Sequence, residues 1–351
     1  MARFSQIGFE PVSAKIAVLP RQVDGTFRTG EWKLVSVVGK SNKTFAQGRI
    51  PAPAYWNAIA DSAQSIWLPT RLPEGRYRVV QGKDRLSSDF EVRTGRDTKL
   101  VKMGMKAFYH NRSSSATDSV FAGKWARPAG HPDTLVNRHA STGQTGTLSA
   151  PKGWYDAGDY GKYIVNSGVS CWLLLDLYES APTIFDSLKW GLPDGPEPEL
   201  LREIKWNLDW MLAMQDADGG VYHKLTSLKF NPMNELPHQD FLHRFVVMKT
   251  TAASLDFTLV LAKGARIWRA HDTGYANLCL RAAQRAWAWS VANPDVLYKQ
   301  PTDVRTGQYE DKQVADERFA AAAELALATS DTALFRSFRE HIVRRATVSS
   351  W

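Results

Sequence analysis

The sequence has few cysteines and no long apolar run. Only 2 cysteines occur in 351 residues, Cys171 and Cys279, and each falls within an apolar helical pattern. We therefore predict two buried free thiols in place of a disulfide or a metal site. No stretch of about 18 apolar residues occurs, so we expect no membrane partner. The first residues also lack a signal peptide, which leaves open a cytoplasmic protein or a chain that begins after processing.

The sequence also lacks any block of like charge. Lysine and arginine total 44 against 36 acidic residues, and the formal net charge is +8. The basic residues are scattered, whereas a nucleic-acid site gathers them on one face. We therefore predict a solvated basic surface and no nucleic-acid partner. Nothing in the sequence indicates an oligomeric state.

Aromatic residues are abundant by contrast, with 13 Trp and 11 Tyr. Flat rings pack in cores, and they also stack against sugar rings or bases. Trp206 and Trp210 form an i, i+4 pair beside the apolar face of a predicted helix. We expect these two rings to pack in the core.

Two kinds of hydrophobic pattern divide the chain. Up to about residue 98, short alternating runs such as "AKIAVLP" are separated by Gly, Pro and Asp. This pattern predicts an antiparallel immunoglobulin-like β-sandwich over residues 1–98. A helical segment at 97–112 and an irregular stretch at 113–153 follow, and a loop of that length is usually functional or disordered. We predict a multidomain β + α protein whose second domain covers 99–351.

The second domain is almost entirely helical in its pattern, and turn or cap residues bound each segment. The lengths of the segments and of their connections indicate helical hairpins laid side by side. The predicted helical segments are 167–182, 197–216, 248–271, 275–294, 314–330 and 331–346.

The stretch "GWYDAGDYGKY", Gly153 to Tyr163, places two aspartates three residues apart. If Gly158 turns the chain and Asp159 opens a helical turn, Asp156 and Asp159 face one space, with helix amides nearby. An ionised carboxylate there could hold and deprotonate a water molecule. An Asx turn followed by a helix cap accounts for the same tetrapeptide, so both interpretations stay open.

Aromatic residues around the two aspartates favour carbohydrate as the ligand. The C–H faces of sugars stack on such rings, while sugar hydroxyl groups bond to carboxylates. No nearby His or Cys has the spacing of a metal site. The aromatic residues of this segment are Trp154, Tyr155, Tyr160 and Tyr163.

The segment "GWYDAGDYGKYIVNSG" resembles the start of the catalytic domain in glycoside hydrolase family 9, especially in the subgroup with an N-terminal immunoglobulin-like domain. "SQIGFEPVSAKIAVL", "LPEGRYRV", "MKAFYHNR" and "LDWMLAMQDADGGVYHKLT" also resemble that subgroup, so the likeness covers nearly the whole chain. It implies an (α/α)6 barrel that hydrolyses β-1,4-glucosidic bonds of cellulose or cellodextrins with inversion. It also implies a secreted or periplasmic protein.

The resemblance assigns roles to individual residues. Asp159 matches the general base, and Asp156 matches the partner aspartate that also holds the water. Trp154 and Tyr155 would shape a neighbouring sugar subsite. His223 matches a residue of the substrate cleft, although a structural loop histidine accounts for it equally well.

The family's general acid, a glutamate close to the end of its catalytic domain, has no counterpart here. Glu235 lies in an early loop, and Glu317 and Glu324 lie in a helical segment. The chain stops after about half of the expected helices, so we expect a partial barrel from a truncated protein, inactive in acid-assisted hydrolysis. The alternatives are an exo-acting cellodextrinase or glucosaminidase of the same fold, and a non-catalytic carbohydrate-binding remnant.

The zinc site of many relatives is altered here. Their "RCG" and "PACH" segments correspond to "RSSS" and "PAGH", with Ser113 and Gly130 at the cysteine positions. His131 and His139 remain as histidines that could contribute, but the thiolate ligands are gone. We therefore predict no zinc, and no cofactor is required for the chemistry.

A calcium site is the second metal that the resemblance implies. Asp316 and Glu317 match acidic residues that bind calcium in several family members, and Asp311 could join them. An acidic helix N-terminus, favoured by the helix dipole, accounts for the same residues. Ala320 replaces an aromatic residue that usually follows this acidic pair, so we do not expect substrate contact there.

Overall fold

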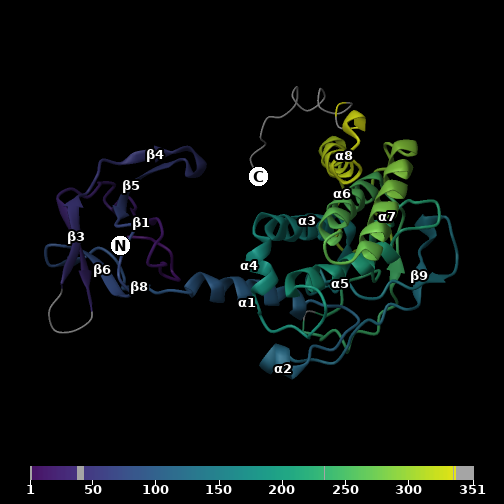
Figure 1. Ribbon diagram of the computed structural model, residues 1–351, viewed down its shortest axis with the longest axis horizontal. Coiled ribbons are helices and arrows are strands. Elements are labelled where there is room, and N and C mark those ends of the chain that lie inside the picture. The colour runs from purple at the N-terminus through teal and green to yellow at the C-terminus, as the bar shows by residue number, and fades with distance from the viewer. Residues whose placement is uncertain (1, 38–42, 233, 335, 337–351) are drawn as a thin grey trace. The chain divides into compact units, whose positions relative to one another are not determined.

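The computed structural model describes residues 2–37, 43–232, 234–334 and 336 of the protein (Figure 1). The chain divides into two compact units, Met1–Met103 and Gly104–Trp351. The division falls within helix α1 (Arg96–His110), whereas the sequence predicts a boundary at residue 98. Helix α1 itself confirms the helical segment predicted at 97–112.

The first unit consists of two antiparallel sheets. One has the strand order β1-β5-β4, and the other has the order β3-β2-β6-β7 with β8 paired to β6. This confirms a strand-rich N-terminal region; its immunoglobulin-like topology stays an interpretation. The strands are β1 (Lys15–Leu19), β2 (Glu31–Ser36), β3 (Thr44–Arg49), β4 (Ala54–Trp56), β5 (Asp61–Leu68), β6 (Gly75–Gln81), β7 (Asp84–Arg85) and β8 (Phe90–Val92).

Buried cross-strand pairs form the core of this unit. Ala17 faces Ile66 in the first sheet, and Leu34 faces Val79 in the second. All four side chains are buried and belong to one hydrophobic cluster. The two-residue alternation in the sequence therefore directs one face of each sheet into a shared core.

The second unit is mainly helical, and five of the six predicted helical segments are confirmed. The sixth, 331–346, falls largely outside the described residues. The short helices at Ser119–Ala122 and Pro182–Ser187 were not predicted. The longer helices are α3 (Ile164–Ser180), α5 (Glu199–Ala213), α6 (Thr251–Trp268), α7 (Thr273–Ala292) and α8 (Ala315–Thr329), and the shorter ones are α2 (Ser119–Ala122) and α4 (Pro182–Ser187).

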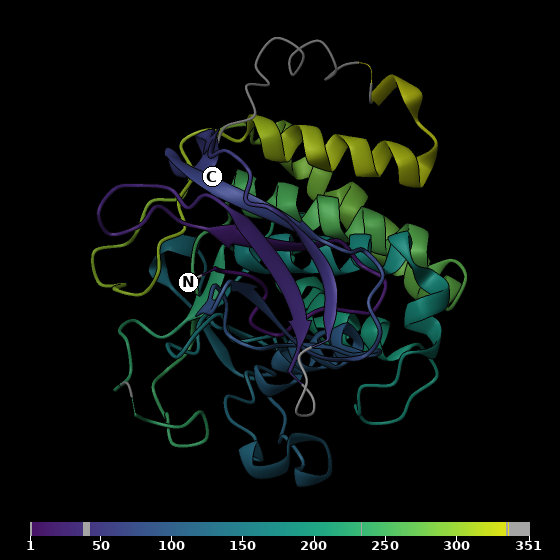
Figure 2. The same ribbon diagram turned by 90° about the vertical axis from the view of Figure 1, so that its left-hand side faces the viewer.

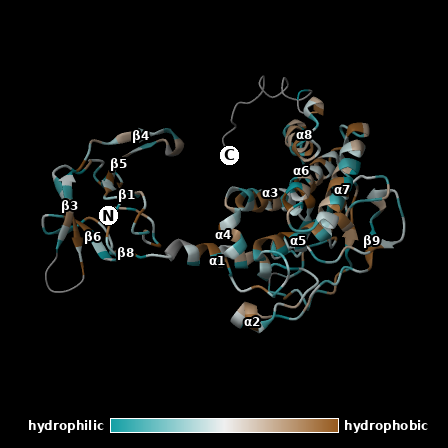
Figure 3. Ribbon diagram, in the orientation of Figure 1, coloured by the Kyte–Doolittle hydropathy of each residue, from teal (hydrophilic) through white to brown (hydrophobic). Residues whose placement is uncertain are grey.

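Helix α6 lies at the centre of this bundle. It packs against α3, α7 and α8, and Figures 1 and 2 show α8 alongside it. Almost every residue of α6 is buried, including polar ones, which is typical of a helix covered on all sides. Figure 3 shows hydrophobic residues in α3, α5, α6 and α7. The Thr250 side chain caps α6 by accepting a hydrogen bond from the amide of Ala253.

The predicted core residues of the helical unit are buried. Cys171 and Cys279 are free thiols with no exposed surface, which confirms the prediction. Burial raises the pKa of both thiols to about 12. Trp210 is fully buried, and Trp206 is partly buried against the guanidinium group of Arg112. No described helix has the length and hydropathy of a membrane span.

A small five-stranded sheet at one end of the helices was not predicted. Its order is β10-β9-β13-β12-β11, and its strands are only two or three residues long, too short for a periodic pattern. It organises part of the long loop 113–153 and leads directly into α3. The strands are β9 (Val136–Arg138), β10 (Thr147–Leu148), β11 (Lys162–Tyr163), β12 (Lys224–Thr226) and β13 (Phe245–Val246).

Candidate active site

The segment with the two aspartates is a tight turn that ends in strand β11. Asp159 does not open a helical turn, so that expectation is wrong: α3 begins at Ile164, after Lys162 and Tyr163 have paired with β12. The left-handed residue is Tyr160, with φ of 54°, and not Gly158. Strand pairing between turn and helix therefore separates Asp159 from the helix amides.

Side-chain and backbone donors of its own segment hold the carboxylate of Asp159. The hydroxyl group of Tyr163 donates to Oδ2 at 2.6 Å, and the amide of Gly161 donates to Oδ1 at 3.2 Å. Burial, followed by the contact with Asp159, raises the pKa of Tyr163, so this hydroxyl group keeps its proton and acts as the donor. Asp159 is partly exposed and can still accept from water.

A second tyrosine and an asparagine hold Asp156. Nδ2 of Asn166 donates to Oδ1 at 2.6 Å, and the Tyr309 hydroxyl group donates to Oδ2 at 2.7 Å. The rings of Tyr309 and Tyr163 meet edge to face with centroids 4.6 Å apart. The two aspartates are therefore linked through a pair of contacting tyrosines. Tyr309 lies 153 residues from Asp156 in the sequence, and no sequence pattern indicates this contact.

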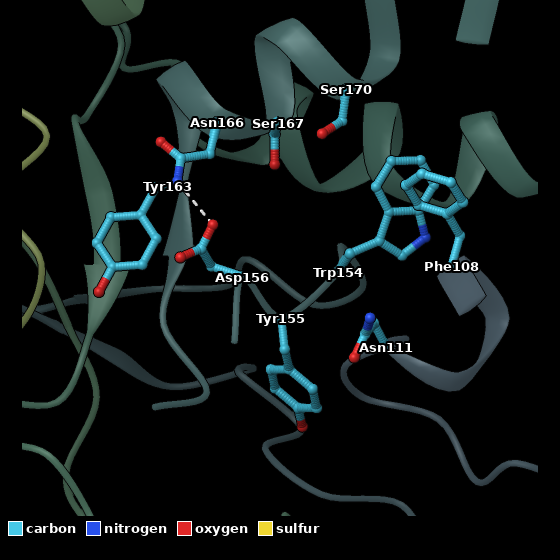
Figure 4. A pocket seen from close by; sticks show the side chains of 9 residues that line it. All are labelled: Phe108, Asn111, Trp154, Tyr155, Asp156, Tyr163, Asn166, Ser167 and Ser170. Carbon is cyan, nitrogen blue, oxygen red and sulfur yellow. Dashed lines mark hydrogen bonds between the residues drawn. The ribbon is translucent and has the colours of Figure 1, made fainter. Parts of the chain in front are cut away.

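A cavity of about 120 Å³ lies beside Asp156 (Figure 4). Asn166, Ser167 and Ser170 of α3 line one edge of it, and Trp154 and Phe108 lie at the end away from Asp156. Asp156 is the one acidic residue among the described residues that line this cavity. Hydroxyl, amide and carboxylate groups beside aromatic rings are the groups that bind sugars. The other lining residues are Asn111, Tyr155 and Tyr163.

Trp154 is buried and held on two sides. Its indole N–H donates to Glu203 at 2.8 Å, and its backbone amide donates to Asn207 at 3.0 Å. Glu203 also forms a buried bidentate ion pair with Arg112, whose Nε donates to Oε1 and whose terminal nitrogen donates to Oε2. The Trp154 ring packs against Phe108 with centroids 4.7 Å apart. The tryptophan predicted to bind substrate is therefore rigidly positioned at the cavity.

Tyr155 points away from Asp156, into a buried polar cluster (Figure 4). Its hydroxyl group lies 2.8 Å from Nδ1 of His131, whose Nε2 lies 3.1 Å from Asp240. Burial raises the pKa of Tyr155 to about 12 and lowers the pKa of His131 to about 4. The phenol therefore donates to a neutral imidazole, and the imidazole donates to the carboxylate of Asp240.

The region in which the family resemblance implies a zinc site offers no open set of zinc ligands among the described residues. Both ring nitrogens of His131 are already bonded within the protein. A Cβ atom on Gly130 would lie 2.5 Å from the carbonyl group of Pro237, so no cysteine side chain can be accommodated there. The Ser113 hydroxyl group lies near the carbonyl oxygen of His131. The absence of zinc stays a prediction for solution.

His139 is also bonded within the protein. The Ser141 amide donates to its Nδ1 at 3.0 Å, so Nε2 carries the proton that faces Asp303 at 3.1 Å. Its side chain is largely buried. Neither histidine of this region offers a free nitrogen to a metal.

The backbone carbonyl group of His223 accepts from the amide of Ile164, and His223 has no exposed surface. Its Nε2 donates to the Gln308 carbonyl oxygen at 3.0 Å, and its Nδ1 accepts from the Thr250 hydroxyl group at 3.0 Å. The ring stacks on Tyr298 with centroids 4.0 Å apart, and burial lowers the pKa of His223 to about 4. These contacts favour the structural interpretation of His223; a direct contact with substrate stays a prediction.

The predicted calcium ligands form a cluster of carboxyl groups at the start of α8. Burial, followed by contacts with Asp311 and Asp316, raises the pKa of Glu317 to about 9. Oε2 of Glu317 is buried without a hydrogen-bond partner. The pKa of Asp256 on α6 is also raised, by burial and by the charges of Asp311 and Asp316.

Carboxylate oxygens are ligands that calcium prefers. Asp311, Asp316 and Glu317 would hold the ion and would have to converge on it. In the parts of the chain described, no three His, Cys, Asp or Glu side chains are grouped closely enough to enclose a metal. Calcium binding therefore stays a prediction.

The other glutamates considered as the general acid lie away from the cavity. Glu324 is buried and ion-paired with Lys263 at 3.4 Å and Arg266 at 2.8 Å. The backbone carbonyl group of Glu235 accepts a hydrogen bond from Tyr160. Neither residue lines the cavity beside Asp156.

Comparison with known proteins places these features in a family. The sequence profile of Glycosyl hydrolase family 9 matches residues 98–350. The xyloglucan-specific endo-β-1,4-glucanase of Bacteroides ovatus is 35% identical over 98% of this chain and 59% of its own length. The cellulose 1,4-β-cellobiosidase of Acetivibrio thermocellus is 28% identical over 93% of this chain and 40% of its own length.

Solved structures agree with the sequence comparison. A family 9 glycoside hydrolase of Bacteroides ovatus superposes with a TM-score of 0.84 and 32% identity, over 97% of this chain and 63% of that protein. The match extends through both units. The chain thus spans 59% of one curated relative and 63% of the solved one.

Proposed function

The chain belongs to glycosyl hydrolase family 9, and from this we propose that it carries the water-activating half of a site that hydrolyses β-1,4-glucosidic bonds with inversion. The observation that supports this most is the pair of aspartates, each held by a tyrosine hydroxyl group, of which Asp156 lines an aromatic cavity. The activity of the whole protein is part of the proposal, because the chain spans 59% of its B. ovatus relative.

Asp159 acts as the general base in this proposal. A water molecule bound to its carboxylate loses a proton to it while the water oxygen bonds to the anomeric carbon. The glycosidic bond breaks on the opposite face of the sugar, which inverts the configuration. Tyr163 and Gly161 fix the carboxylate but leave each oxygen a lone pair for water.

Asp156 holds the same water and aligns it. Asn166 and Tyr309 each occupy one position on its two oxygens, and the side chain is otherwise exposed. Trp154 and Tyr155 would form the wall of the adjoining sugar subsite. Both rings are locked by buried hydrogen bonds, so substrate binding would cost little side-chain entropy.

The leaving group needs a separate acid about 6.5–9.5 Å from the base in an inverting glycosidase. We assign no described carboxyl group to that role. Positioned general acids contribute about 10²–10⁴-fold to such reactions. The chain alone should therefore be a poor catalyst on unactivated glucans, and it could also act as a carbohydrate-binding remnant.

The substrate is proposed only at the level of a β-1,4-linked glucan or its oligosaccharides. The two curated relatives are named for xyloglucan and for cellulose, so their names differ in the polymer. Exo action on cellodextrins or on glucosamine oligosaccharides is the alternative within the same fold. We propose a secreted or periplasmic location, because such polymers lie outside the cytoplasm.

Binding and turnover of three oligosaccharides test this proposal. Cellohexaose, a xyloglucan oligosaccharide and a glucosamine hexamer are titrated calorimetrically, and new reducing ends are counted. We expect the chain to bind a glucan and to turn it over at least about 10²-fold more slowly than the B. ovatus relative. Binding of the glucosamine hexamer alone would change the substrate class, and no binding of any would contradict the proposal. Turnover equal to the relative's would show that an acid is present.

A further inference from the structure

The ammonium group of Lys162 is fully buried at the base of the turn that carries both aspartates. It lies 2.7 Å from Oδ2 of Asp133, 2.6 Å from the carbonyl oxygen of Lys152 and 3.2 Å from that of Ala150. An ammonium group has three N–H donors, and here three oxygens face it. It donates hydrogen bonds to the two carbonyl oxygens and forms an ion pair with the Asp133 carboxylate inside the protein.

These contacts join the two ends of the segment 150–162. The carbonyl groups of Ala150 and Lys152 lie at its beginning, and Lys162 lies at its end in β11. Asp156 and Asp159 lie between them, and Tyr163, which donates to Asp159, follows directly. We propose that Lys162 is a positioning residue whose ammonium group closes this loop and thereby fixes both carboxylates relative to α3. The proposal rests on the proposed function insofar as these carboxylates are the working groups.

The anchor of this contact is itself held firmly. Nε of Arg244 lies 3.2 Å from Oδ1 of Asp133, and the carbonyl group of Asp133 accepts from the amide of Ala150 at 2.8 Å. The Asp133 carboxylate has no exposed surface. Asp133 also adopts a left-handed conformation with φ of 49°, which surrounding contacts must maintain. The carboxylate can therefore act as a fixed point for Lys162.

Aromatic packing completes the base of the loop. The Lys162 ammonium group lies 5.4 Å from the centroid of a Trp210 ring. A Cβ atom on Gly153 would lie 2.8 Å from Cγ of Trp210, so the loop enters across the face of this indole at a residue that only glycine can occupy. Gly153 also has φ of 83°. Gly153 near the beginning of the loop and Lys162 at its end therefore both lie against the Trp210 indole.

Stability alone does not explain a charge at this position. The desolvation of a buried ion pair offsets much of its Coulomb energy, and apolar side chains of similar volume often serve stability equally well. An ammonium group, in contrast, can hold oxygens of two different segments at fixed positions. This is the arrangement around Lys162.

Hydrogen exchange of the loop amides tests the inference without any substrate. The amide of Asp156 donates to the carbonyl group of Gly161, and the amide of Gly161 donates to Asp159. In the variant Lys162→Met, we expect both amides to exchange at least about tenfold faster, while the amides of α6 keep their protection. Lys162→Arg keeps the charge, but its planar guanidinium group cannot place its donors as the ammonium group does. It should also speed the exchange of both loop amides, and it replaces Lys162→Met in the experiment if that variant does not fold.

Lys263→Met is the matched control, because Lys263 is also a buried lysine surrounded by carboxylates, on α6. It should leave the loop amides unchanged. Unchanged exchange of the loop in the Lys162 variants, or an equal loss of protection in α6, would overturn the inference.

A kinetic measurement separates this inference from the proposed function. With a substrate whose leaving group needs no acid, 2,4-dinitrophenyl β-cellobioside, Lys162→Arg should lower kcat about 10²-fold and leave KM within about twofold. If the wild-type chain is inactive on this substrate, the proposed function fails, and the exchange result still decides whether Lys162 positions the loop. If kcat is unchanged although the wild type is active, the positioning role is wrong.

Discussion

The hydroxyl group of Tyr163 donates a 2.6 Å hydrogen bond to Oδ2 of Asp159, four residues earlier in the chain. Tyr163 is both the last residue of β11 and the residue that precedes α3. The same residue therefore connects the sheet, the helix and the carboxylate of the proposed base. Its position sets the direction from which Asp159 can bind water.

Replacing Tyr163 with Phe should weaken water activation without unfolding the protein. Asp159 would lose one of its two protein donors, and a hydrogen bond to a charged group contributes about 1.5–3 kcal/mol. We expect kcat on 2,4-dinitrophenyl β-cellobioside to fall at least about tenfold. Tyr178→Phe is the control, because it removes a 2.7 Å hydrogen bond to Asp186 at the other end of α3. Equal rates in the two variants would show that the Tyr163 contact has no role.

Stability should decrease on acidification because of His223. Burial lowers its folded-state pKa to about 4, whereas the ordinary value is 6.5, so the unfolded chain takes up a proton first. The contribution of neutral His223 to the free energy of unfolding is fully present above pH 6.5 and is lost as the pH falls toward 4. Urea denaturation across this range should show the decline, and His223→Gln should make it shallower.

The exposed His243 provides the comparison for this measurement. His243→Gln should keep the wild-type pH dependence. Burial also lowers the pKa of His131 to about 4, so His131 makes stability decrease on acidification as well. Part of the pH dependence of stability should therefore remain in His223→Gln. A pH dependence identical in His223→Gln and the wild type would contradict the assignment.

The buried ion pair between Glu203 and Arg112 should be costly to break. Glu203 has no exposed surface, and it accepts from both Arg112 and Trp154. Glu203→Gln leaves the Arg112 charge uncompensated, so we expect a loss of about 3–5 kcal/mol in the free energy of unfolding. Asp176→Asn, at a carboxylate 54% exposed, should cost about 0–1 kcal/mol. Similar costs for both variants in urea denaturation would contradict this account of Glu203.

Calcium should stabilise the protein at alkaline pH if the carboxyl cluster at α8 binds it. The folded-state pKa of Glu317 is raised to about 9 from 4.5, so stability should fall as pH rises between these values. A calcium ion would offset the charges of Asp311, Asp316 and Glu317. We expect millimolar calcium to raise the thermal midpoint at pH 8 and Glu317→Gln to reduce that response. Identical midpoints with calcium and with a chelator would contradict calcium binding.

The long helices could be predicted from the sequence because their apolar periodicity extends over many residues. Helices α5, α6 and α8 fall within predicted segments, and α3 and α7 overlap theirs but begin a few residues earlier. The sheet β9–β13 could not be predicted, because strands of two or three residues have no measurable period. Because Lys162 and Tyr163 pair within this sheet, α3 begins at Ile164 and not at Asp159 as expected.

The sequence motif identified Asp156 and Asp159, whereas it did not identify the side chains that orient the loop and its carboxylates. Tyr309 contacts Asp156 across 153 residues, and Asp133 pairs with Lys162 across the irregular loop. Such contacts depend on how distant segments of the chain pack together, so a local sequence pattern cannot predict them. The motif therefore identified the charged groups but not the side chains that orient them.

Hydrolysis of 2,4-dinitrophenyl β-cellobioside by the wild type and Asp159→Asn tests the central proposal most directly. The dinitrophenolate leaves without protonation, so the measurement does not depend on a general acid. We expect the wild type to release the α-anomer of cellobiose, as inversion requires, and Asp159→Asn to be slower by about 10²–10⁴-fold. Equal rates, or release of the β-anomer, would contradict the role of Asp159 as the base of an inverting site.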